Sequence, residues 1–366
     1  MHWSLRASSI TLRAATTYEL GPVSPELQLI IDLCRRSFAR KSKHDVIDVP
    51  DGVDRDELLR LARFHRVQGL VANSLPSSAA REALAPDALS ISATNLRAAV
   101  ESREILNDFD AVGVPLLFMK GLTLGALGYS KPLLKMGWDI DLLVGPDHIG
   151  AAGKVLIQRG YRLVLPKEST NLQTWHRQRK ESVWAHGEEI YVELHSRLPD
   201  NPSLIPDITV RSPRQSVQVA QGISLPTLAT DELFAYLCVH GASSAWFRLK
   251  WITDFAALIH GRPPAEIEHL YQRAQELGAY RAADQALLLA DALYGSLDGT
   301  DLKPRLLRER ASRTLFGAAL HQLEQAEEPT ETLFGTWRIH WTQLLLKGDV
   351  TFKLGEASRQ LRDAIT

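Results

Sequence analysis

The chain has few of the features that mark secreted, disulfide-rich or membrane-spanning proteins. Two of its 366 residues are cysteines, Cys34 and Cys238, and each lies inside an apolar helical pattern. A disulfide framework needs cysteines at higher density, so we expect two buried, reduced thiols. No apolar run approaches the roughly 18 residues that cross a bilayer. These absences exclude a disulfide scaffold and predict a cytoplasmic protein with no membrane partner.

An excess of charge of either sign is also lacking. The 42 lysines and arginines are balanced by 43 aspartates and glutamates, which gives a formal net charge of -1. Such a chain has no global field that would draw it to nucleic acid or to an anionic membrane. The composition is compatible with a local basic groove but does not indicate one. We therefore do not expect nucleic acid as a partner.

The length exceeds that of one ordinary core and indicates two or three packed units. Apolar spacing predicts helices at both ends of the chain, and Gly113 and Pro115 mark the change to short strand-like runs. We divide the chain into a flexible tail or edge strand (1–23), an N-terminal helical region (24–110), a mixed core (111–225) and a C-terminal helical region (226–366).

Local signals place the individual elements. Asp54 is a plausible N-cap for a helix from Arg55, and Thr230 before Asp231 and Glu232 predicts the start of another. Apolar spacing predicts a buried helical stripe through Ile91 to Phe109. Strands are expected at 114–119, 140–144 and 161–165, with a hairpin formed by 183–186 and 190–194. Helices are expected at 122–129, 147–159, 246–260, 264–277, 281–294 and 304–323.

The most informative segment is Trp138-Asp139-Ile140-Asp141-Leu142-Leu143-Val144. Side chains alternate along a strand, so Asp139 and Asp141 share one face and Ile140 points to the other. Two neighbouring carboxylates repel each other unless a cation lies between them, and magnesium commonly uses one or two carboxylates plus substrate phosphates. The pattern therefore predicts a divalent-metal site, although Asp-x-Asp also occurs in turns and on solvated edges.

Two further features favour the metal site. Glu193 and His195 lie on one face of a second alternating segment, Tyr191-Val192-Glu193-Leu194-His195. A glutamate on a core strand is costly to bury without a partner, and a metal ion would supply one. The turn Lys120-Gly121 lies about 18 residues before Asp139. Its glycine lets the backbone approach a phosphate, and its lysine supplies a positive charge.

These segments, in this order, resemble the polymerase-β-like nucleotidyltransferase superfamily. More narrowly, Phe118-Met119-Lys120-Gly121, Trp138–Val144 and Val192-Glu193-Leu194-His195 resemble a bacterial family of nucleotidyltransferases. Members of that family are often encoded beside natural-product, lasso-peptide or polysaccharide genes. The resemblance covers roughly residues 105 to 260 and continues through Val239-His240-Gly241, Arg248-Leu249-Lys250-Trp251 and Asp254. It implies an α+β fold, with a polymerase-β-like core of mixed sheet and helices flanked by helical regions.

The resemblance also implies an activity. An NMP would pass from an NTP, with ATP as the expected co-substrate, to a hydroxyl of a small molecule, peptide or protein, and pyrophosphate would leave. Asp139, Asp141 and Glu193 would hold Mg²⁺, or Mn²⁺ in its place, and Glu193 could also take the acceptor's proton. The sequence does not indicate the oligomeric state.

The nucleotide contacts follow the same resemblance. Lys120 would neutralise the β- or γ-phosphate and Gly121 would donate a backbone N–H. The superfamily's usual turn is Gly-Ser or Gly-Gly, so Lys120-Gly121 is a variant phosphate loop, which the narrower family shares. Where such relatives tend to carry an arginine before the Asp-x-Asp, this chain has Lys135.

Other assignments stay open at this stage. His195 could orient Glu193, touch the acceptor, or be a hydrogen-bonded structural histidine. Arg248 and Lys250 fit a solvated face or a phosphate contact, and Asp254 would pair with one of them. Two other functions compete with the proposed transferase: a catalytically silent binding or regulatory module, and an enzyme that modifies tRNA or another nucleic acid.

Overall fold

The computed structural model describes residues 23–38, 50, 52–167, 171–187, 190–326 and 335–365. The expected tail at 1–23 lies outside these residues apart from Val23. Cys34 and Cys238 are buried free thiols, as expected. No described helix combines the length and the apolar character needed to cross a membrane.

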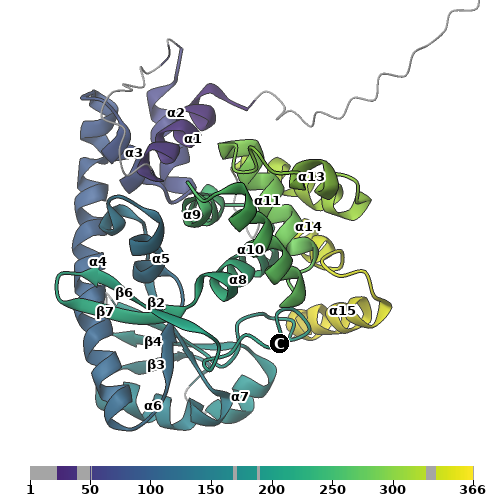
Figure 1. The fold of residues 1–366 in the computed structure, drawn as a ribbon. Coiled ribbons are helices and arrows are strands. Elements are labelled where there is room, and N and C mark those ends of the chain that lie inside the picture. Colours follow the sequence, from purple (N-terminus) through teal and green to yellow (C-terminus); the bar gives the residue numbers. More distant parts are fainter. Residues whose placement is uncertain are drawn as a thin grey trace, which may run out of the picture.

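Among the described residues, four helices precede the sheet. They are α1 (Pro25–Phe38), α2 (Arg55–Phe64), α3 (Gln68–Ser74) and α4 (Ala79–Ala111). Asp54 caps α2 as predicted, because its side chain accepts hydrogen bonds from the backbone N–H groups of Asp56 and Glu57. The stripe expected at Ile91–Phe109 belongs to the much longer α4. Figure 1 shows α4 running along one side of the whole structure.

The predicted stripe on α4 is partly wrong. Ala99 and Ile105 are buried, whereas Leu96 and Val100 are 47% and 49% exposed. Because α4 lies at the side of the molecule, only one face of the helix is covered by the rest of the protein.

The mixed core contains the sheet. Its elements are β1 (Leu116–Phe118), α5 (Gly121–Gly128), η1 (Pro132–Leu134), β2 (Asp139–Val144), η2 (Pro146–His148), α6 (Ile149–Gln158), β3 (Arg162–Leu165), α7 (Leu172–Gln178), β4 (Glu181–His186) and β5 (Ile190–His195). The strand order is β1-β2-β5-β4-β3. Strands β2 and β5 are parallel, and every other pair is antiparallel. The expected strands and the β4–β5 hairpin are therefore confirmed.

A second, two-stranded sheet follows that the sequence did not predict. It consists of β6 (Arg214–Ala220) and β7 (Ile223–Leu228). Pro226 lies inside β7, where we expected the strand-rich part to have ended. Proline is tolerated here because each strand of a two-stranded sheet has an unpaired edge.

The remaining elements are helices. They are α8 (Thr230–Ser243), α9 (Leu249–Ile259), α10 (Pro264–Glu276), α11 (Arg281–Tyr294), α12 (Leu302–Leu306), α13 (Arg310–Gln325), α14 (Gly335–Gln343) and α15 (Val350–Ile365). The predicted N-cap at Thr230 is wrong by one residue. Ala229 occupies the cap position without a side-chain hydrogen bond, and Thr230 is the first helical residue.

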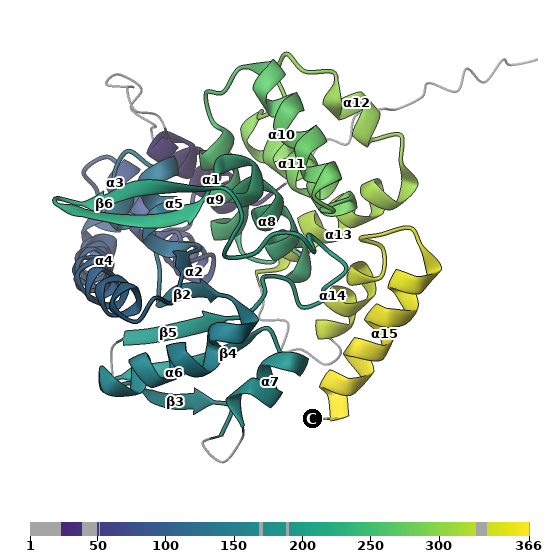
Figure 2. The ribbon, with the colours of Figure 1, turned by 60° about the horizontal axis from the view of Figure 1, so that its bottom comes forward.

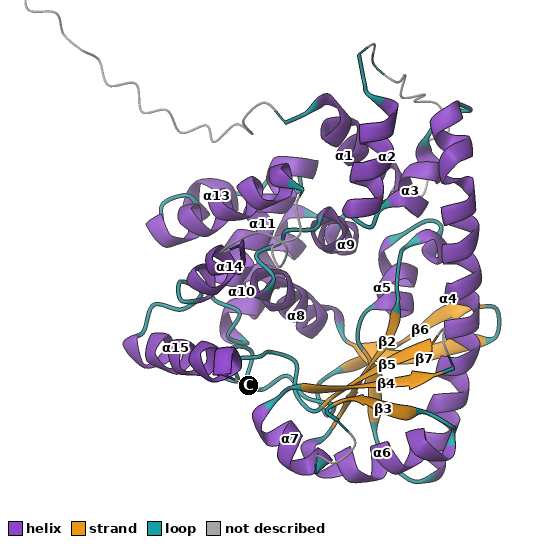
Figure 3. Ribbon diagram, turned by 180° about the vertical axis from the view of Figure 1, so that it is seen from behind, coloured by secondary structure: helices purple, strands orange, loops and turns teal. Residues whose placement is uncertain are grey.

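Two hydrophobic cores result. One lies among the sheet, α4, α6 and the β6–β7 hairpin, and the other joins α1–α3 to α5 and to α8–α13. Helices from both ends of the chain thus share one core. Figure 3 shows α6 and α7 against one side of the sheet, with α5 and the helical part on the other. The ends of β2 and β5 lie where the two cores meet.

Candidate active site

The acidic side chains lie on the two parallel strands at the centre of the sheet. In the register of β2 and β5, Asp141 is the neighbour of Glu193, and Leu143 is the neighbour of His195. Paired residues of adjacent strands point to the same face, so Asp139, Asp141, Glu193 and His195 face one way. The alternate residues of β2 are buried in the sheet core and fix this orientation.

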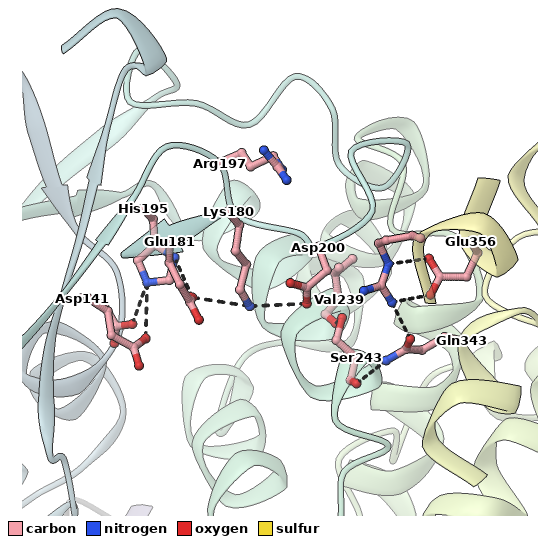
Figure 4. Close-up of polar contacts among 12 residues, drawn as sticks. Asp141, Lys180, Glu181, His195, Arg197, Asp200, Val239, Ser243, Gln343 and Glu356 are labelled. Carbon is pink, nitrogen blue, oxygen red and sulfur yellow. Dashed lines mark hydrogen bonds and ion pairs between the residues drawn. The ribbon is translucent and has the colours of Figure 1, made fainter. Parts of the chain in front are cut away.

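Asp141 is the centre of the cluster. Its Oδ1 lies 2.8 Å from Lys120 Nζ and 3.2 Å from His195 Nε2. His195 Nε2 also lies 3.4 Å from Glu193 Oε2, and His195 Nδ1 lies 3.2 Å from Glu181 Oε2. The ligand atoms of Asp141, Glu193 and His195 all lie within 4.8 Å of one another. Figure 4 shows Asp141, His195 and Glu181 in this arrangement.

The charges of the cluster are strongly coupled. Burial by itself would raise the pKa of Asp141, but the Lys120 ammonium and His195 hold that pKa far below its usual range. Burial by itself would lower the pKa of His195, but its hydrogen bonds to Asp141 and Glu193 and the charge of Glu181 raise it to about 9. His195 is therefore protonated at neutral pH, and two cationic groups balance the buried carboxylate.

These residues open onto a cavity of about 500 Å³ between the sheet and the C-terminal helices. Its lining consists of Arg66, Lys120, Gly121, Leu124, Lys135, Gly137, Trp138, Asp139, Asp141, Lys180, Glu181, Glu193, His195, Tyr236, Leu237, His240, Trp246, Lys250, Trp251 and Asp254. Asp139 faces this cavity, and no described residue forms an ion pair or hydrogen bond with its carboxylate. The predicted acids therefore share one cavity, in which Asp141 and Glu193 are the closely clustered pair.

The Lys120-Gly121 turn forms the start of α5. Gly121 has a φ of +53°, a conformation that residues with a Cβ rarely adopt. A methyl group there would meet only the backbone oxygen of Asp139, at 3.7 Å, so the backbone conformation and not space requires glycine. The first N–H groups of a helix lack intrahelical acceptors and favour anions. The turn thus presents an ammonium group and a helix N-terminus beside the carboxylates.

Lys135 lies in the same cavity but is already paired. Its Nζ is 3.2 Å from Asp254 Oδ2, and the Tyr129 hydroxyl donates to Asp254 Oδ1 at 2.6 Å. Asp254 therefore pairs with Lys135, whereas the sequence suggested Arg248 or Lys250. Only 4% of the Lys135 side chain is exposed, and this network holds it at the cavity wall.

Arg248 is absent from the described residues that line the cavity. Its guanidinium donates to the carbonyl of Phe64 and lies over the Phe64 and Phe247 rings, which joins α9 to the end of α2. The structure thus does not bring Arg248 to the predicted phosphate site.

The sequence left Lys250 open between a solvated face and a phosphate contact, and it missed two other cationic groups of the cavity, Arg66 and Lys180. Arg66 follows α2 in a left-handed conformation, with a φ of +58°. Lys180 directly precedes β4, and Lys250 lies in the first turn of α9. No motif marks Arg66 or Lys180, and only the fold brings their two segments together with Lys250. The cavity is therefore more basic than the Lys120-Gly121 turn alone implies.

Lys250 gives the cavity a measurable pH dependence. Burial, together with the charge of Lys135, lowers its pKa to about 8. Between this value and the ordinary lysine pKa of about 10.4, the unfolded chain binds more protons than the folded protein, so the free energy of unfolding rises with pH. Below pH 8 Lys250 is charged in both states, and its buried charge destabilises the folded protein by the full amount. We expect Lys250→Met to stabilise the protein by about 1–3 kcal/mol at pH 7 and to flatten the pH dependence above pH 8. Urea unfolding at pH 7 and pH 9.5 measures both effects, and equal stabilisation at the two values would contradict the assignment.

The donor set fits a hard divalent cation. Asp139, Asp141 and Glu193 offer carboxylate oxygens, which Mg²⁺ and Mn²⁺ prefer, and they line the same cavity. The protonated His195 cannot be a ligand until it loses its proton. The geometric cluster Asp141, Glu193 and His195 thus marks a possible metal site in which the two carboxylates are the suitable donors.

A cavity lined by both carboxylates and lysines is suited to binding phosphate groups together with a metal ion. The chain belongs to a family described as uncharacterised nucleotidyltransferases, whose sequence profile matches residues 51–295. No curated protein matches the chain. The protein is therefore a nucleotidyltransferase, which confirms the predicted enzyme class. The matched range begins before α2 and ends after α11, so it includes every residue of the cavity.

Proposed function

We propose that the protein transfers an NMP from an NTP to a hydroxyl group of a small molecule, peptide or protein in a metal-dependent reaction that releases pyrophosphate. The observation that carries the proposal is the convergence of Asp139, Asp141 and Glu193 with Lys120 on one cavity. We further propose that the sheet is a polymerase-β-like core and that ATP is the first nucleotide to test.

In this reaction the acceptor oxygen forms a bond to the α-phosphorus as the bond to the bridging oxygen of the pyrophosphate breaks. Glu193, which is 26% exposed at the edge of the cluster, would take the proton of the acceptor hydroxyl. A bound Mg²⁺ would supply charge for the attacking and leaving oxygens. Asp139, Asp141 and Glu193 would hold it.

The leaving pyrophosphate needs positive charge of its own. Lys120 and the N-terminus of α5 lie on one side of the acids, and Arg66 and Lys250 line the same cavity. Lys120 bonds to Asp141 in this structure. With Asp141 engaged by a metal ion, Lys120 would be free to contact a phosphate, and the binding of metal and nucleotide would then be cooperative.

Calorimetric binding of each of the four NTPs as non-hydrolysable analogues, with and without Mg²⁺, tests the proposal. We expect magnesium-dependent binding of at least one analogue. Glu193→Gln should retain that binding and lose pyrophosphate release by about 10²-fold or more, because it removes the proton acceptor and one metal oxygen. Glu82→Gln, on the exposed side of α4, is the matched control. Absence of nucleotide binding at millimolar concentrations with either Mg²⁺ or Mn²⁺ would contradict the proposal.

A further inference from the structure

Tyr236 differs from the other buried tyrosines of the protein. Among the described residues, the buried tyrosines are Tyr129, Tyr161 and Tyr236. The Tyr129 hydroxyl donates to Asp254 at 2.6 Å, and the Tyr161 hydroxyl donates to Glu101 at 3.0 Å. The Tyr236 hydroxyl has no hydrogen-bond partner among the described residues, although a buried tyrosine usually finds one. Its hydroxyl is therefore available to a ligand.

The unpartnered hydroxyl reaches the catalytic cavity. Tyr236 belongs to α8 and lines this cavity with only 3% of its surface exposed. Unlike Trp246 Nε1, which is sealed without a partner, the Tyr236 hydroxyl oxygen keeps access to open space. Figure 2 shows α8 between the sheet and the helices α10 and α11. Since the acids lie on the sheet, Tyr236 faces them from the opposite wall of the cavity.

The ring of Tyr236 is held by its neighbours. His240 lies one turn later on α8, and the two ring centroids are 5.6 Å apart at an angle of 40°. Trp251 of α9 meets His240 edge-on, at 6.0 Å and 89°. Burial and the charges of Lys120 and Lys180 hold the pKa of His240 well below its ordinary value, so this histidine is uncharged at neutral pH. This aromatic wall thus presents the Tyr236 hydroxyl as a fixed, uncharged group.

The charges around the Tyr236 hydroxyl indicate where in the cavity it lies. Burial raises the pKa of Tyr236 well above its ordinary value, which keeps the hydroxyl protonated at neutral pH. Lys120 and Lys180 act against this rise in pKa, whereas Asp141 and Glu193 add to it. Lys120 follows β1, the two acids lie on β2 and β5, and Lys180 precedes β4. Because the strand order is β1-β2-β5-β4, a group that is near all four lies over the middle of the row.

In the proposed transfer, the α-phosphorus occupies this middle position. Lys120 would hold the leaving phosphates on one side of the acids, and Glu193 would take the proton of the acceptor on the other. The non-bridging oxygens of the α-phosphoryl group carry negative charge while the bonds to phosphorus exchange. A hydrogen-bond donor that is fixed in place before the reaction stabilises such charge without reorganisation.

We propose that Tyr236 is a catalytic residue whose hydroxyl donates a hydrogen bond to a non-bridging oxygen of the α-phosphoryl group during its transfer. This inference rests on the proposed transferase function and adds a donor from the C-terminal helical region to the acids on the sheet. The acceptor oxygen bonds to the α-phosphorus as the bond to the bridging oxygen of the pyrophosphate breaks. The proton of the acceptor passes to Glu193, and Tyr236 keeps its own proton.

The variant Tyr236→Phe tests this role, because it removes the hydroxyl oxygen and keeps the ring. We expect magnesium-dependent pyrophosphate release to fall by about 10²-fold, as for the loss of one transition-state donor, with a much smaller loss of affinity for the NTP. Thermal stability should be unchanged, since no hydrogen bond of the fold is broken. Tyr271→Phe on α10 is the matched control, because the Tyr271 hydroxyl donates to Asp284 at 3.0 Å and Tyr271 is absent from the described lining of the cavity. It should lower the thermal stability and leave pyrophosphate release unchanged.

A second measurement needs no acceptor and no turnover. The ³¹P NMR spectrum of the α,β-imido analogue of ATP, bound with Mg²⁺ to the full-length protein, reports each phosphorus separately. We expect Tyr236→Phe to shift the α resonance alone and Lys120→Met to shift the β or γ resonance, which separates the two contacts. An unchanged α resonance would overturn the contact to the α-phosphoryl group.

The outcomes separate this role from the transferase function. Wild-type activity that persists undiminished in Tyr236→Phe would remove Tyr236 from catalysis and leave the function standing. Joint loss of pyrophosphate release and thermal stability would show that the hydroxyl serves the fold, and equal losses of release and of NTP affinity would make Tyr236 a binding residue only. Failure of the wild type to bind any NTP analogue would contradict the transferase function and the role of Tyr236 together.

Discussion

Replacing Asp139 with asparagine is expected to abolish nucleotidyl transfer and leave the protein as stable as the wild type. The Asp139 carboxylate faces the cavity, and no described residue bonds to it, so its removal breaks no contact of the fold. If it holds the metal, the loss of one oxygen ligand should lower turnover by about 10³-fold or more. Pyrophosphate release and thermal unfolding, measured on the same preparation, check both parts.

Asp141→Asn is the informative comparison. This change should also abolish transfer, but it removes the ion-pair partner of Lys120 and one of the three carboxylate partners of His195. Breaking a buried ion pair from one side is strongly destabilising, and we expect a loss of about 2–4 kcal/mol. The two aspartates would then have equal effects on activity and unequal effects on stability. Equal losses of stability would show that Asp139 has a structural partner, and retained activity in Asp139→Asn would remove it from the metal site.

The sequence predicted the acidic strands because their signals are local. Alternation alone places Asp139 and Asp141 on one face, and the same rule places Glu193 beside His195. The two acidic faces come together because β2 and β5 pair in parallel, in a register that puts Asp141 opposite Glu193. The sequence singled out Gly121 for the approach of a phosphate to the backbone, whereas the structure gives a different reason for glycine there, a φ of +53°.

The cationic part of the site could not be predicted in the same way. Arg66, Lys180 and Lys250 lie in three different segments, and their common cavity follows from the packing of the helical core against the sheet. Arg248 illustrates the reverse error, since a basic residue beside Lys250 looked equally suited to a phosphate. The start of α9 directs Arg248 to the carbonyl of Phe64, whereas Lys250 faces the cavity. The β6–β7 hairpin was missed because Pro226 reads as a strand terminator.

Lys120→Met should uncouple the metal from the nucleotide. The Lys120 ammonium pairs with Asp141, and although burial by itself would lower the pKa of Lys120, Asp141 and the other acids raise it well above its usual value. Methionine keeps the length of the side chain and removes its charge, so Asp141 becomes more available to a cation. We expect Mg²⁺ or Mn²⁺ alone to bind about tenfold more tightly. The nucleotide should bind more weakly, by about tenfold or more, because a phosphate contact is lost.

Calorimetric titration of each ligand separately measures the two changes, with Lys131→Met, an exposed lysine of the following loop, as the control. Weaker binding of both ligands would mean that Lys120 serves only to hold Asp141 in place. Tighter metal binding together with weaker nucleotide binding would show that Lys120 competes with the metal ion for Asp141 and contacts the nucleotide.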